Sequence, residues 1–258
     1  SLENKSEIDK LTENAIKNAE NTKEDSQLIA KVVSNVSEGL ANQLVEEVSK
    51  TSTDEKQTLS AKVLQAIVDT EPSKMDIIDN EVKDTMIQQT IESAKNQQEG
   101  TGIQEGENFT DIVSDIIVNT DTETAAKVIE EINNVDTETN LSLEIISGVS
   151  EKDSEVLNEL SANNKEQIEQ LAEDAIQKAE NTSEDSQLIA NVVSKANDEI
   201  LNNMVETVSQ VAENDSDKGS LSAKVLKAIV DTEPDKINAI DEEIKDTLIE
   251  QTIDATKR

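Results

Sequence analysis

Histidine, cysteine, tryptophan and tyrosine are all missing from this chain of 258 residues, and phenylalanine occurs once, as Phe109. Without cysteine there is no disulfide and no thiolate nucleophile, and without histidine no side chain titrates near neutrality in its ordinary state. The usual ligands of zinc, haem and iron–sulfur clusters are lost with them. The sequence therefore predicts no enzymatic activity, and it assigns no catalytic, cofactor-binding or metal-binding residue.

Basic residues are also scarce. The chain has 57 Asp and Glu against 23 Lys and Arg, which gives a formal charge of −34, and its only arginine is Arg258. Such a charge repels nucleic-acid phosphates and anionic lipid surfaces. The longest apolar runs, such as residues 116–118, are far shorter than a membrane span. We therefore expect a protein partner, either another protein or the chain itself, and no nucleic acid, membrane insertion or small-molecule substrate.

What the chain does contain is Ile, Val and Leu in helical register, which predicts a folded protein rather than a disordered one. Leu28, Ile29, Val32 and Val33 have the spacing of one helix face. A polar turn and a second aliphatic stripe follow, so each instance predicts an αα-hairpin. The pattern begins at Leu28, Val63, Ile112, Ile145, Leu188 and Val225.

Long segments of the chain occur twice. Residues 221–253 match residues 59–91 at 24 of 33 positions, and residues 11–30 return at 171–190. A more diverged copy lies between them, where residues 112–132 correspond to 28–48. Hairpins this polar cannot fold alone, so we expect them to stack on one shared aliphatic core. Leu64 and Leu226 occupy the same position in that core.

These repeats predict an all-α fold, an elongated α-solenoid of tandem helical hairpins in three double-hairpin units of about 80 residues. The architecture resembles HEAT-like or armadillo-like solenoids in general form, without a family signature. The boundaries fall at 1–82 for unit 1, 83–167 for unit 2 with a Gly-rich connector at 99–108, and 168–247 for unit 3. Residues 248–258 begin a further unit or form a C-terminal capping helix. We favour the further unit, which would make the chain an excerpt of a longer array.

Two signals predict where helices begin. Three pairs of residues have the spacing of a capping box and predict a helix start: Thr22 with Asp25, Thr182 with Asp185 and Thr120 with Glu123. Pro72 and Pro234 each follow an Asp-Thr-Glu triplet, where a proline in the first turn starts a helix.

Three features are candidates for chemistry or binding. Residues 99–109 contain three of the six glycines and Phe109, and predict a connector with Phe109 under the next hairpin or, alternatively, a docking loop with one aromatic anchor. Residues 213–220 resemble a calcium loop, but Lys218 and Val225 take ligand positions, which favours a helix-connecting turn. Adjacent carboxylates at 46–47, 130–131 and 242–243 point about 100° apart on a helix, which indicates solvated faces rather than acid–base pairs.

Two functions remain. One is a non-enzymatic structural or scaffolding segment of a larger, surface-exposed protein, acting as a spacer and assembly element. The alternative is a solenoid binding module that grips a peptide or basic partner on its concave face. Binding hot spots favour Trp, Tyr and Arg, which this chain almost lacks, so the structural function is preferred. No cofactor is predicted beyond weak association of Ca²⁺ with surface carboxylates. An extracellular or cell-surface setting is favoured over the cytoplasm.

Overall fold

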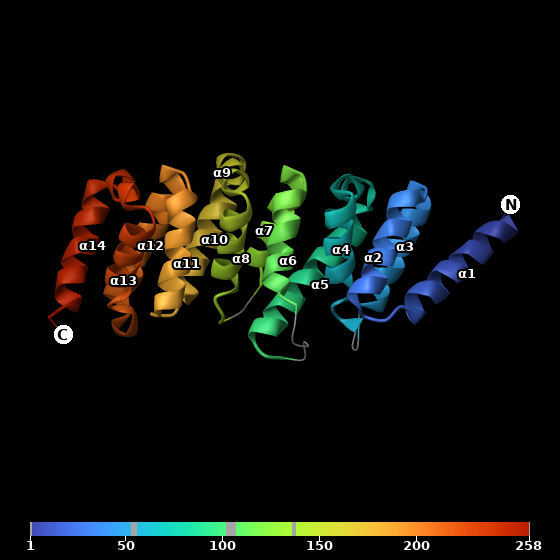
Figure 1. Cartoon of the computed structure of the whole chain (residues 1–258), viewed down its shortest axis with the longest axis horizontal. Helices are drawn as coiled ribbons and strands as arrows, with labels where there is room; N and C mark the ends of the chain where they lie inside the picture. Colours follow the sequence, from blue (N-terminus) through green and yellow to red (C-terminus); the bar gives the residue numbers. More distant parts are fainter. Residues whose placement is uncertain (1, 53–55, 102–106, 136–137, 258) are drawn as a thin grey trace. The chain divides into compact units, whose positions relative to one another are not determined.

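Helices make up the fold (Figure 1). The computed structural model describes residues 2–52, 56–101, 107–135 and 138–257, and none of these residues lies in a strand. Residue contacts divide the chain into two compact units, Ser1–Glu131 and Ile132–Arg258. The predicted all-α helical repeat fold is confirmed, whereas its division into three double-hairpin units stays a prediction.

The first compact unit is two layers of helices. One layer is α1, α3 and α5, in which α3 packs against both others; the other is α2, α4 and α6, with α4 between α2 and α6. Here η marks a 3₁₀ helix. The elements of this unit are α1 (Leu2–Asn18), α2 (Lys23–Asn35), α3 (Glu38–Thr51), α4 (Leu59–Thr70), η2 (Pro72–Ile77), α5 (Asn80–Gln98), α6 (Phe109–Asn119) and α7 (Thr122–Asn133), whose last two residues belong to the second unit.

The second compact unit repeats this plan. Helix α11 packs between α8 and α13 in one layer, and α12 packs between α10 and α14 in the other. Its elements are α8 (Leu141–Lys152), α9 (Ser154–Asn163), α10 (Lys165–Lys178), α11 (Ser183–Lys195), α12 (Asp198–Asn214), η3 (Ser216–Lys218), α13 (Leu221–Thr232), η4 (Pro234–Ala239) and α14 (Glu242–Ala255).

The six predicted aliphatic stripes lie on six separate helices, α2, α4, α6, α8, α11 and α13. Their inward positions form the core: in α4, Val63, Leu64 and Ile67 are all completely buried. Burying an aliphatic side chain of this size stabilises the folded state by about 1.5–3 kcal/mol. The core is therefore made of many medium-sized aliphatic side chains, and Phe109 at the start of α6 is its largest member.

Two of the three predicted helix caps are confirmed. Thr22 accepts a hydrogen bond from the Asp25 N–H at 3.2 Å, and Thr182 accepts one from Asp185 at 3.0 Å. The returning bond differs from a capping box, because the Asp25 carboxylate accepts from the Glu20 N–H at 2.6 Å rather than from Thr22. The Thr22 N–H is already bonded to the Glu20 carbonyl, so the donor two residues earlier is the one that needs a partner.

The third predicted cap, Thr120, is wrong. Thr120 closes α6 instead, and its hydroxyl donates to the Ile116 carbonyl at 2.7 Å. Asp121 caps α7 by accepting from the N–H groups of Glu123 and Thr124, at 2.9 and 3.0 Å. Partial burial opposes ionisation of Asp121, but these bonds and the Thr124 hydroxyl outweigh it and hold the pKa of the carboxyl below its usual value.

Pro72 and Pro234 are confirmed as helix starters, although each begins a 3₁₀ helix, η2 or η4, rather than an α-helix. The chain then turns into the next helix of the opposite layer, α5 or α14. An asparagine from α3 secures the first of these turns, since Asn42 donates to the Ile77 carbonyl at 3.0 Å and accepts from the Asp79 N–H at 2.7 Å. The matching bonds in the second unit run from Asn202 to the Ala239 carbonyl (3.2 Å) and from the Asp241 N–H to Asn202 (2.8 Å).

Several lysines bond to backbone carbonyls in the last turn of a helix or in the connection that follows it, where the carbonyls have no partner within a helix. Lys56 donates to the carbonyl of Lys17, in the last turn of α1, at 2.6 Å, and Lys62 donates to that of Asn21 at 2.7 Å. The second unit repeats both bonds: Lys218 to Gln177 and Lys224 to Asn181, each at 2.5 Å. A cation at the C-terminal end of a helix is also favoured by the helix dipole. These bonds fix one hairpin to the next.

The predicted equivalence of Leu64 and Leu226 is wrong. Leu64 is completely buried in α4, while Leu226, at the same position of α13, is only half-buried. The physical reason is the neighbouring helices: α4 has α2 on one side and α6 on the other, whereas α13 packs against α11 with no described helix in the place of α6.

Candidate functional site

The adjacent carboxylates lie on helix surfaces among lysines. Glu46 and Glu47 on α3 both pair with Lys50, at 2.6 and 3.3 Å, and the bond to Glu46 is the main cause that raises the pKa of Lys50. Glu130 and Glu131 on α7 both pair with Lys127, at 3.5 Å. Glu242 and Glu243 lie in the first turn of α14, where the helix dipole favours them. The structure places these pairs on different helices and brings none of them together around a shared cavity.

Phe109, the proposed aromatic anchor, is buried in the core with 1% of its surface exposed. Gln97 of α5 fixes the chain around it by accepting from the Phe109 N–H at 2.8 Å and donating to the Glu107 carbonyl. Gly100 has a φ of 69°, a left-handed conformation that glycine adopts without strain, and it ends α5. Phe109 is therefore buried, as the connector interpretation predicts, whereas residues 102–106 of the connector lie outside the described residues.

The segment that resembles a calcium loop forms a turn between α12 and α13. Asp215 accepts from the Asp217 N–H at 2.9 Å, and the Asp217 carbonyl accepts from Asn181 at 2.8 Å. Lys218 donates to the Gln177 carbonyl of α10. These bonds support the helix-connecting turn. Throughout the part of the chain that the structure describes, no cluster of three or more His, Cys, Asp or Glu could hold a metal ion.

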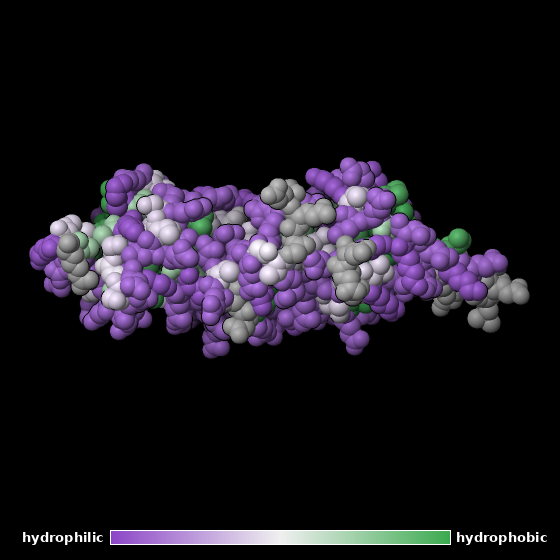
Figure 2. All heavy atoms as spheres, turned by 90° about the horizontal axis from the view of Figure 1, so that it is seen from below, coloured by the Kyte–Doolittle hydropathy of each residue, from purple (hydrophilic) through white to green (hydrophobic). Residues whose placement is uncertain are grey.

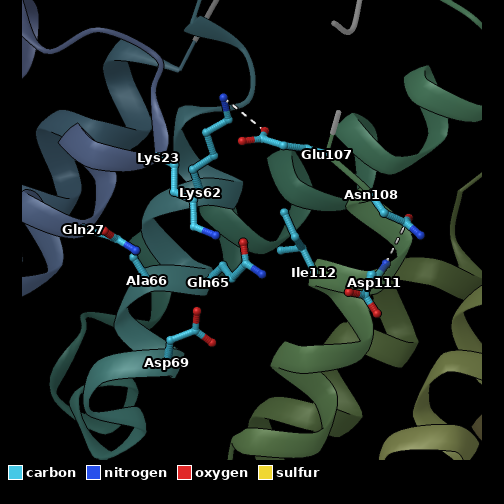
Figure 3. A pocket seen from close by; sticks show the side chains of 10 residues that line it. All are labelled: Lys23, Gln27, Lys62, Gln65, Ala66, Asp69, Glu107, Asn108, Asp111 and Ile112. Atoms are coloured by element: carbon cyan, nitrogen blue, oxygen red, sulfur yellow. Dashed lines mark hydrogen bonds and ion pairs between the residues drawn. The ribbon is translucent and has the colours of Figure 1, made fainter. Parts of the chain in front are cut away.

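A polar notch of about 260 Å³ lies between α2, α4 and the segment that leads into α6 (Figure 3). Lys62 crosses it to reach Glu107 at 3.1 Å, while also donating to the Asn21 carbonyl. The positive charge of Lys62 is therefore already matched by a carboxylate. The other lining side chains are Lys23, Gln27, Gln65, Ala66, Asp69, Asn108, Asp111 and Ile112. Amide, ammonium and carboxylate groups predominate among them, so the notch offers hydrogen bonding.

An apolar groove of about 430 Å³ lies between α1, α2 and α3. Leu11, Leu28 and Val32 form its rim and are 69%, 61% and 39% exposed. We call these three residues the α1–α2 face. A second exposed aliphatic set, Val230, Ile249 and Ile253, lies on α13 and α14, and we call it the α13–α14 face. Among the residues whose side-chain burial the structure describes, which leaves out residues 1–6, 8 and 9, these six are the large aliphatic side chains with substantial exposure.

Hydrophilic residues cover most of the side of the molecule that Figure 2 shows. Exposed aliphatic side chains such as those of the two faces are few among the residues whose burial the structure describes. Sequence reasoning missed them because each residue belongs to a stripe that predicts a buried helix face. The sequences of the two copies are too similar to show which positions are exposed, so these residues are found only once the burial of each side chain is known.

No helix in the described parts of the chain combines the length and apolarity that crossing a membrane requires. Comparison of the sequence with models of known protein families gives no match, and comparison with curated proteins gives no significant match. The function must therefore be argued from the residues and their arrangement.

Proposed function

We propose that this chain is a non-enzymatic structural segment of a larger, surface-exposed protein, in which it acts as a spacer and assembly element. The observation that carries the proposal is the repetition of the bonds between hairpins. The bonds of Asn42, Lys56 and Lys62 recur at the same positions of the second unit, from Asn202, Lys218 and Lys224.

In each unit a glutamine also makes two bonds, one to a helix of its own layer and one to a helix of the other layer. Gln89 of α5 donates to the Ser49 carbonyl at 2.9 Å and accepts from the Ser60 hydroxyl at 2.5 Å. Gln251 of α14 donates to the Ser209 carbonyl at 2.9 Å and accepts from Ser222 at 2.6 Å. Side chains that bond backbone groups across helices fix the spacing and orientation of those helices. Repetition of one such joint is what a spacer of defined length requires.

A spacer must hold a defined distance, and this can be measured directly. The chain has no cysteine, so spin labels can be attached at Glu46→Cys and Glu206→Cys, exposed and equivalent positions on α3 and α12. Pulsed electron–electron double resonance should give one narrow distribution of the distance between the two labels. A control pair within one unit, Glu46→Cys with Glu92→Cys, measures how broad the distance distribution becomes from motion of the labels alone.

Dilution with unlabelled chain keeps the measurement within single molecules. A distribution across the two units that is much broader than the control pair would rule out the spacer function. A narrow distribution that survives changes in salt would support it.

A binding module for a basic peptide is the second candidate, and the charge of −34 is the observation that favours it. Calorimetric titration with a lysine- and arginine-rich peptide separates the two. Saturable binding at one site that persists at about 0.15 M salt, where the screening length is about 8 Å, would favour the module. Binding that disappears as salt is added would indicate charge attraction without a specific site.

A further inference from the structure

We draw no further inference here: the strongest candidate, the pair of exposed apolar surfaces formed by the α1–α2 face and the α13–α14 face, carries no proposal because nothing in the structure shows what covers either of them.

Discussion

Residues 59–91 and 221–253 have nearly the same sequence and the same helices, yet they differ in how deeply they are buried. In the first copy, α4 and α5 are covered by α6, and Leu64, Ile87 and Ile91 are all at most 1% exposed. In the second copy, Leu226 is half-buried and Ile249 and Ile253 are almost half exposed. The helix follows from the local sequence, while burial depends on which helix comes next.

The largest difference in the free energy of unfolding should come from placing a charge at Ile87 and at its counterpart Ile249. Ile87→Asp buries a carboxylate without a partner and should lower the free energy of unfolding of the first unit by more than about 4 kcal/mol. Ile249→Asp places the same carboxylate near water and should cost about 1 kcal/mol or less. Urea denaturation followed by circular dichroism, with hydrogen exchange read separately in each unit, measures both. Similar losses at the two positions would contradict the burial difference.

A smaller difference is expected between Leu64→Ala and Leu226→Ala. The first leaves a cavity in a fully packed site and should cost about 2–4 kcal/mol. The second removes a half-buried side chain whose space water can fill, and should cost about 1 kcal/mol. Hydrogen exchange should show the loss of protection concentrated in the helices next to the substituted one. A uniform loss along both units would argue against stability that is local to neighbouring hairpins.

Asn42 and Asn202 should behave alike, because both make the same two bonds to backbone groups. Replacing either with alanine leaves two backbone partners unsatisfied and should cost about 1–2 kcal/mol, equally in the two copies. Aspartate at the same position keeps the acceptor and loses the donor, so its cost should be smaller. Urea titration of the four variants tests the equality. A cost confined to one copy would show that the repeated bonds are not equivalent.

The smallest effect should come from salt, and it should also be equal in the two copies. Their carboxylates recur at the same positions: Glu71, Asp79 and Glu81 in one, and Glu233, Asp241 and Glu243 in the other. Raising salt from 0.01 to 0.1 M shortens the screening length from about 30 to about 10 Å and should raise the melting temperature by a few degrees. CaCl2 at matched ionic strength should add a further rise if carboxylates bridge calcium. Identical melting in NaCl and CaCl2 would remove the calcium hypothesis and leave screening.

The helices themselves could be predicted from the sequence because their signals are local. Each aliphatic stripe specifies a helix face, and Thr22 and Thr182 cap the helices that follow them. Thr120 failed as a cap because Asp121, one residue later, offers a charged acceptor that reaches two N–H groups. The capping-box spacing of Thr120 with Glu123 does not take into account that the neighbouring Asp121 carboxylate is the stronger acceptor.

The apolar faces could not be predicted because exposure is not a local property. Val68 ends the segment Gln-Ala-Ile-Val and Val230 ends the nearly identical Lys-Ala-Ile-Val, and both lie in an α-helix. One is 3% exposed and the other 48%. The packing of α6 on α4 and α5 distinguishes them, and α6 itself lies outside the repeated segment. Phe109 was predictable because a lone aromatic residue at the start of an aliphatic helix has the core as its most favourable environment.

The lysines that bond to backbone carbonyls have a consequence for the protein in crowded solution. Lys56 and Lys218 direct their ammonium groups to carbonyls in the last turns of α1 and α10, and Lys62 and Lys224 direct theirs to carbonyls in the connections that follow these helices. Much of the acidic surface must then be neutralised by mobile cations from the medium, and each molecule carries an atmosphere of them. When two molecules meet side by side, their ion atmospheres overlap and the resulting osmotic pressure separates them.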